Sequence, residues 1–138
     1  MLVNLSFRRI LWTGLVTTLA ALATNLLFFA LTHLFGEQYN MPLSDPISRV
    51  GPMPVTMVIV STLLLGFLAT VLFGLLVRFV KNPMTMFLSI SITALIVSFG
   101  GPYYLPEAGV QTKVLLSIMH ILTALFITGG ILLLNRKK

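Results

Sequence analysis

The sequence predicts an all-α fold, a bundle of four transmembrane helices in one domain that covers residues 1–138. Hydrophobic residues make up 57% of the chain and charged residues only 9%, whereas soluble domains carry about 25% charged residues. Four apolar segments are each long enough to cross about 30 Å of hydrocarbon as a helix, which takes roughly 20 residues. Barrel strands would be about 10 residues long and would alternate. Lipid is therefore the expected solvent for most of this chain.

The first segment runs from about residue 10 to 35 and ends at Gly36. A cleaved signal peptide is the competing interpretation, because "SFRRILW" is similar to a twin-arginine signal. The apolar run is, however, about 26 residues long, well beyond the 7–15 residues of a signal core. We therefore expect a retained membrane span.

The second and third segments, about 55–80 and 84–100, are separated by about three residues and form a predicted antiparallel hairpin. Prolines precede both segments, as is typical of the first helical turn. The sequence Gly100-Gly101-Pro102 is expected to stop the third segment. The fourth segment, about 113–134, ends at Asn135. The proline-rich loop between the first two segments is expected to fold across the outer mouth of the bundle.

The basic residues predict the orientation, because cytoplasmic loops are enriched in Lys and Arg. Seven of the nine basic residues fall on one side of the predicted membrane, which places both termini in the cytoplasm: Arg8, Arg9, Arg78, Lys81, Arg136, Lys137 and Lys138. The other side carries the remaining two and all three acids: Arg49, Lys113, Glu37, Asp45 and Glu107. These charges lie at the ends of spans, so they do not indicate nucleic-acid binding.

Small and polar residues recur at helical spacing on every segment. The stripes on the four segments, in order, are Gly14, Thr18, Ala21, Asn25 and Thr32; Thr62, Gly66, Thr70 and Gly74; Ser91, Ala94, Ser98 and Gly101; and Lys113, Ser117, His120, Ala124 and Thr128. In membranes such stripes pack against other helices, and the bulky faces meet lipid.

Two residues of these stripes, Asn25 and His120, stand near the predicted midplane. The helical rise places them roughly 15 Å and 12 Å below the outer ends of their segments. An ionisable group at this depth is a functional hypothesis by default. The structural alternative is a neutral imidazole that is satisfied by Asn25, by Ser117 or by a hydroxyl on the third segment. Both interpretations stay open.

The outer ends of the segments carry the other candidate residues, His33, Tyr103 and Tyr104. Aromatic residues at this level are typical of a membrane interface. The more specific hypothesis is a pocket open to the outside, with His120 and Asn25 at its floor and the proline-rich loop as its roof. The candidate ligand-binding set is therefore His120, Asn25, Ser117, His33, Tyr103 and Tyr104.

Several chemistries are excluded or weakened. The chain has no cysteine, and no acid lies near the depth of His120 to complete a catalytic triad. Zinc would need three or four ligands, and haem ligation by His33 and His120 would have to bridge a depth difference of roughly 9 Å. We therefore expect neither catalytic residues nor a metal site, and we assign no cofactor.

Short motifs of the chain resemble a family of small bacterial four-span membrane proteins that is known only as a domain of unknown function. These motifs are "PMPV" before the second segment, "RFVKNP" in the inner turn, "SFGGP" after the third segment and "MH" in the fourth. The resemblance implies a multi-pass protein of the bacterial plasma (inner) membrane and brings no known activity.

The expected function is that of a small non-enzymatic membrane protein in contact with the lipid bilayer, either an accessory subunit of a larger complex or a homo-oligomer. Its outward-facing pocket could bind an apolar or lipid-like ligand. The alternative is a small transporter that uses His120 and Asn25, although small multidrug exporters rely on an acidic residue in the first span. An enzyme acting on lipid or quinone is the third hypothesis.

Overall fold

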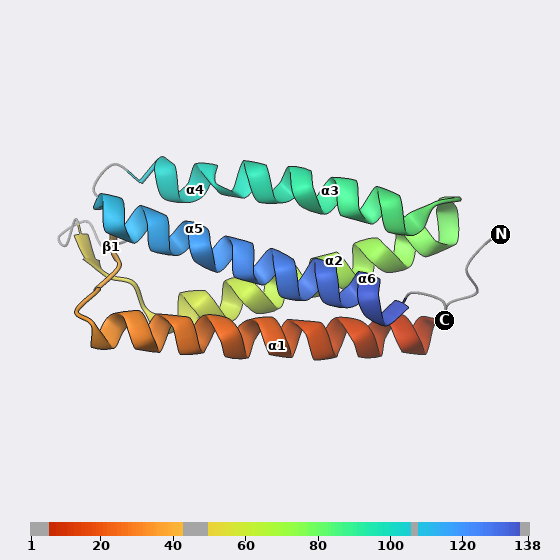
Figure 1. Cartoon of the computed structure of the whole chain (residues 1–138), viewed down its shortest axis with the longest axis horizontal. Helices are drawn as coiled ribbons and strands as arrows, with labels where there is room; N and C mark the ends of the chain where they lie inside the picture. Colours follow the sequence, from red (N-terminus) through yellow and green to blue (C-terminus); the bar gives the residue numbers. More distant parts are fainter. Residues whose placement is uncertain (1–5, 43–49, 106–107, 136–138) are drawn as a thin grey trace.

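A computed structural model of the chain describes residues 6–42, 50–105 and 108–135. It contains four helical segments that are long and apolar enough to cross a membrane, lying lengthwise side by side (Figure 1). The helices are α1 (Phe7–Leu34), α2 (Val55–Phe79), α3 (Pro83–Ser98) with α4 (Gly100–Tyr103), and α5 (Val110–Ala124) continued by the π-helix η1 (Leu125–Gly129) and α6 (Gly130–Asn135). Two short antiparallel strands are β1 (Asn40–Pro42) and β2 (Val50–Pro52).

The four predicted segments are confirmed as helices, with two corrections at their ends and interior. The third does not stop at Gly100, because the chain continues as α4 to Tyr103. Pro102 lies in the first turn of α4, where the N–H that proline lacks has no helical partner in any case. The fourth segment contains five residues of π-helix at Leu125–Gly129, which its apolar pattern did not reveal. Of the charges used to predict orientation, those outside the described residues are Asp45, Arg49, Glu107 and Arg136, Lys137 and Lys138.

The contact between α1 and α2 is built from two matched pairs of glycine and threonine. Gly14 of α1 faces the side chain of Thr70, and Gly66 of α2 faces the side chain of Thr18. Each threonine hydroxyl donates to the glycine carbonyl four residues earlier in its own helix, Thr18 to Gly14 at 2.6 Å and Thr70 to Gly66 at 2.7 Å. The hydroxyls are thereby satisfied within their own helices, and the missing Cβ atoms let the two backbones approach closely.

The last helical segment packs against α1 at the end of the bundle where α1 begins. Gly130 faces the side chain of Thr17, and the fully buried Asn135 donates to the Thr13 hydroxyl at 3.0 Å. The Arg9 guanidinium donates to the carbonyl of Leu134 at 2.6 Å. A cation at a helix C-terminus is favourable, because the last carbonyls carry partial negative charge.

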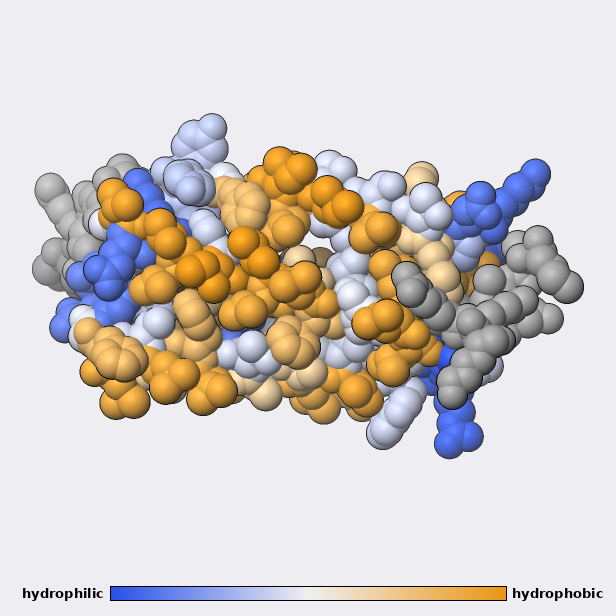
Figure 2. Space-filling view, in the orientation of Figure 1, coloured by the Kyte–Doolittle hydropathy of each residue, from blue (hydrophilic) through white to orange (hydrophobic). Residues whose placement is uncertain are grey.

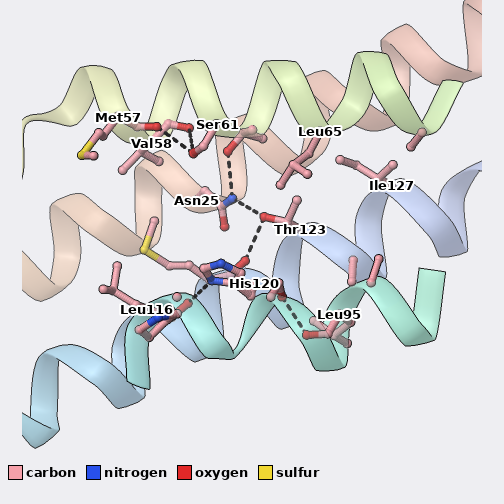
Figure 3. A pocket seen from close by; sticks show the side chains of 18 of the residues that line it. Asn25, Met57, Val58, Ser61, Leu65, Leu95, Leu116, His120, Thr123 and Ile127 are labelled. Atoms are coloured by element: carbon pink, nitrogen blue, oxygen red, sulfur yellow. Dashed lines mark hydrogen bonds between the residues drawn. The ribbon is translucent and has the colours of Figure 1, made fainter. Parts of the chain in front are cut away.

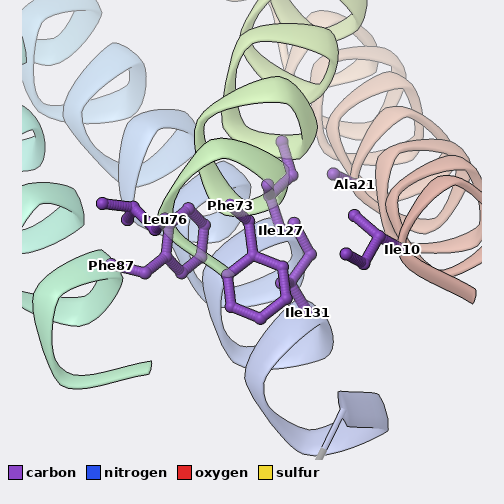
Figure 4. Close-up of a cluster of buried hydrophobic side chains, with 7 residues drawn as sticks. All are labelled: Ile10, Ala21, Phe73, Leu76, Phe87, Ile127 and Ile131. Carbon is purple, nitrogen blue, oxygen red and sulfur yellow. The ribbon is translucent and has the colours of Figure 1, made fainter. Parts of the chain in front are cut away.

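The main apolar core lies in the same half of the bundle and joins all four helical segments (Figure 4). Phe73 of α2 and Phe87 of α3 meet edge to face, with ring centroids 5.1 Å apart, and both are fully buried. The other members of this cluster are Ile10, Ala21, Leu76, Ile127 and Ile131.

The outer surface is hydrophobic along the middle of the bundle, and hydrophilic residues gather at its two ends (Figure 2). The segment formed by α3 and α4 is the least enclosed of the four. Only 6% of its most apolar stretch is buried, against 22–33% in the other three segments. Helix α3 therefore presents most of its surface to the surroundings.

Candidate functional site

A pocket of about 450 Å³ lies between α2 on one side and α3, α4 and α5 on the other. Figure 1 shows α2 and α3 close together at their connecting turn and increasingly separated toward the end that carries the strands. A hollow opens between α3 and the helices below it in the space-filling view (Figure 2). The divergence of the hairpin thus creates the pocket.

The pocket lining is mainly apolar and includes four methionines, Met41, Met53, Met57 and Met119. Met41 belongs to β1, and Met53 lies just after β2, so the strand-containing loop contributes to one end of the pocket. Methionine side chains are flexible and polarisable, and they adapt to ligands of differing shape. The described ends of the loop therefore lie at this end of the bundle, and the part of the predicted roof at residues 43–49 lies outside the described residues.

Asn25 of α1 connects three helices at the wall of the pocket (Figure 3). Its side-chain Nδ2 donates to the hydroxyl of Thr62 in α2 at 3.2 Å and to that of Thr123 in α5 at 2.6 Å. The side chain is only 2% exposed. Its Oδ1 is buried and has no hydrogen-bond partner among the described residues. A buried acceptor without a partner costs about 1–3 kcal/mol. A ligand that donates a hydrogen bond to this oxygen would remove that cost, so the oxygen is the atom of the pocket that most directly indicates a ligand.

His120 of α5 lines the same pocket and is half-buried. Its Nδ1 lies 2.7 Å from the carbonyl oxygen of Leu116, one turn earlier in the helix. Asn25 is one of the partners predicted for a neutral imidazole, but the Asn25 amide bonds Thr62 and Thr123 instead, and His120 bonds the backbone of its own helix. Figure 3 nevertheless shows the Asn25 oxygen directed toward the part of the pocket where the His120 ring lies.

The structure separates the other predicted site residues from this pocket. The Ser117 hydroxyl donates to the carbonyl of Lys113 in its own helix at 2.8 Å. His33 is exposed and its Nδ1 bonds the carbonyl of Glu37 at 2.9 Å. Tyr103 and Tyr104 are 62% and 87% exposed. None of the four belongs to the pocket lining that the described residues form.

A second polar cluster fixes the loop that adjoins the pocket. The Glu37 carboxylate oxygen Oε1 accepts the backbone N–H of Tyr39 at 2.9 Å and the hydroxyl of Thr112 at 2.7 Å. Tyr39 is fully buried, stacks on Phe29 with centroids 5.1 Å apart and shares a 2.5 Å hydroxyl–hydroxyl bond with Thr32. Its φ of 50° is unusual for a non-glycine residue. The loop is thus held to α1 and α5 by specific bonds.

The pKa of the Tyr39 phenol is raised above its ordinary value. Burial is the main cause, the hydrogen bond with Thr32 opposes it, and the nearby Glu37 carboxylate adds to it. Tyr39 is therefore a neutral, packed side chain at neutral pH.

The predicted stripes already placed Thr62 among the inward residues, but sequence reasoning did not pair Thr62 or Thr123 with Asn25, and it missed the four methionines of the lining. Thr123 follows His120 by three residues, so helical spacing already placed both on one face. Met53 and Met57 lie four residues apart, but loop geometry was needed to bring Met41 beside them. Among the described residues, no group of three or more His, Cys, Asp or Glu side chains could hold a metal ion.

A model of one protein family, described as a family of unknown function (DUF6069), matches residues 5–137. This match confirms the resemblance that the short motifs indicated. No curated protein and no solved structure gives a significant match to the chain.

Proposed function

Since the chain belongs to DUF6069, a family of unknown function, we propose a function from the pocket itself: this is a small, non-enzymatic integral membrane protein that binds an apolar, lipid-like molecule. It acts as an accessory subunit or a homo-oligomer in the plasma (inner) membrane of a bacterium. The observation that carries the proposal is an apolar pocket with one unpaired, buried polar atom, Asn25 Oδ1.

The surface supports insertion in a membrane. The middle of the bundle is hydrophobic, and both ends are hydrophilic (Figure 2). Four described basic residues, Arg8, Arg9, Arg78 and Lys81, flank the helix ends opposite the strands. Enrichment of Lys and Arg marks the cytoplasmic side, which supports cytoplasmic termini and a pocket nearer the outer leaflet.

The size and chemistry of the pocket support a lipid-like ligand. Small-molecule pockets have volumes of about 300–1,000 Å³ and are mostly apolar, with a few polar groups that orient the ligand. The pocket here has a volume of about 450 Å³. It lies where α2 and α3 diverge, so an amphiphile could enter between these helices from the surrounding lipid.

The uncovered surface of α3 supports an oligomer or a larger complex. Helix α3 is far less enclosed than the other three segments, and membrane helices associate by close packing of small and hydroxyl-bearing residues. The lipid bilayer and a protein partner are thus the two proposed neighbours of this helix.

The test is purification of the full chain in a mild detergent, followed by mass spectrometry of the small molecules that are retained. Ala94→Phe places a ring in the pocket from α3, since Ala94 is part of its lining. Ala30→Phe is the matched control, because Ala30 is an exposed residue of α1 outside the lining. The proposal expects a retained amphiphile in the wild type and in Ala30→Phe, and its loss in Ala94→Phe. Equal retention by the two variants would refute the pocket as the binding site.

A further inference from the structure

The orientation of the Asn25 amide is fixed by its neighbours. The hydroxyl of Thr123 donates to the carbonyl of Met119 at 2.8 Å, so its only proton is already engaged. The atom of Asn25 that lies 2.6 Å from this hydroxyl must therefore be the donating Nδ2. Both protons of Nδ2 are then used, one on Thr123 and one on Thr62. The group that Asn25 leaves for a ligand is a carbonyl oxygen, which is an acceptor only.

The tautomer of His120 follows from the same reasoning. Its Nδ1 lies 2.7 Å from the Leu116 carbonyl oxygen, and a carbonyl cannot donate. Nδ1 therefore carries a proton, and in the tautomer that this bond selects Nε2 is left as an acceptor. No partner for Nε2 is found among the described residues, and the ring lines the pocket.

Further acceptors come from serine hydroxyls of the lining. Ser61 donates to the carbonyl of Met57 and Ser98 to that of Leu95, both at 2.7 Å. Each hydroxyl has one proton, so these oxygens can only accept from a ligand. The hydroxyls of Thr62, Ser91 and Thr128 complete the polar lining and can rotate. The described lining contains no charged side chain that could balance an anionic or cationic group.

From this arrangement of acceptors we infer that the ligand is a neutral, apolar molecule with at least one O–H or N–H donor, such as a lipophilic alcohol or phenol. An ether, ester or ketone of the same shape would leave Asn25 Oδ1 and His120 Nε2 unpaired. A site built to bond a ligand hydroxyl discriminates against the analogue that lacks it, because its own buried polar atoms are then unsatisfied. The inference rests on the proposed function and names the ligand class of that same pocket.

The test compares 4-octylphenol with 4-octylanisole, its methyl ether, on the full chain in lipid nanodiscs. Binding of radiolabelled 4-octylphenol is measured directly, and unlabelled 4-octylphenol and 4-octylanisole then compete for it. We expect saturable binding that Ala94→Phe abolishes, and competition by the anisole that is about tenfold weaker, as the loss of a buried hydrogen bond implies. Equal competition by the two probes would overturn the inference but leave the pocket in place. No saturable binding of the labelled phenol would overturn the proposed function as well.

The contribution of His120 is tested by His120→Phe, which keeps an aromatic ring and removes Nε2. The same substitution at His33, an exposed residue outside the pocket, is the matched control. We expect His120→Phe to reduce the preference for the phenol severalfold and His33→Phe to leave it unchanged. An unchanged preference in His120→Phe would show that its Nε2 does not select the ligand. The comparison of probes on the wild type does not depend on how well either variant folds.

Discussion

The close contact of α1 with α2 predicts that one methyl group at Gly66 destabilises the fold. A Cβ atom at this position would lie 2.7 Å from Cβ of Thr18 and closer still to the rest of that side chain. Rotation of Thr18 about χ1 cannot move its Cβ, so the two helices must separate. The same substitution at Gly74, two turns along the same helix, would meet its nearest neighbour, Ile10, at 3.9 Å, an ordinary contact.

The comparison of Gly66→Ala with Gly74→Ala isolates this steric effect. Both substitutions change intrinsic helix propensity by about 1 kcal/mol in the same direction, so that contribution cancels in the difference. Extra atoms in a well-packed contact typically cost about 1–3 kcal/mol. We therefore expect the free energy of unfolding of Gly66→Ala to be about 1–3 kcal/mol lower than that of Gly74→Ala.

The assay is reversible unfolding in mixed micelles of a mild detergent and dodecyl sulfate, followed by circular dichroism. Thr18→Gly removes the opposing Cβ and serves as the second site of a double-mutant cycle. Gly66→Ala should lower the free energy of unfolding of the wild type but change that of the Thr18→Gly variant little. Equal stability of Gly66→Ala and Gly74→Ala would refute the proposed contact between α1 and α2.

Two further predictions concern the other contacts of α1. A Cβ at Gly130 would overlap Thr17, whereas a Cβ at Gly129 would meet no described atom within 4 Å; Gly130→Ala should therefore melt below Gly129→Ala in the same detergent, and the opposite order would contradict the packing of α6. Tyr39→Phe removes the hydrogen bond to Thr32, which should cost about 1 kcal/mol at neutral pH. Because burial raises the folded-state pKa of Tyr39, its stabilising contribution is complete below the unfolded value of about 10 and is lost as pH rises through the folded value. The measurement is the free energy of unfolding of both proteins as the pH is raised above about 10. An equal decrease in the wild type and in Tyr39→Phe would contradict this burial.

The helices of this fold were predictable because length and composition decide whether a segment can cross hydrocarbon. The ends were less predictable. Gly100-Gly101-Pro102 resembles a helix stop, yet proline is tolerated in a first turn, and a new turn starts there. The π-helix at Leu125–Gly129 has no signal in an apolar pattern, because it changes the hydrogen bonds of the backbone and not the composition.

The depth of the candidate site residues was predictable from the sequence, but their hydrogen-bond partners were not. Helical rise placed Asn25 and His120 at similar depths, and both do line one pocket. Depth does not fix rotation about the helix axis, which is set by packing such as the Gly66–Thr18 contact. Asn25 consequently meets two hydroxyls instead of the imidazole. His120 needs no distant partner, because the carbonyl of Leu116 one turn away already accepts its proton.

The loose enclosure of α3 has a consequence for the kinetics of exchange. The walls that α1, α2 and α5 form are held together by the close glycine contacts of α1 with α2 and by the hydrogen bonds of Asn25. The fourth wall is α3, whose most apolar stretch is only 6% buried and whose fully buried Phe87 lies near the turn that joins it to α2. Segments with few buried contacts open at the lowest free energy. Under the proposed function, we expect the residence time of a bound molecule to be set by excursions of α3 about that turn, while the rest of the bundle stays folded.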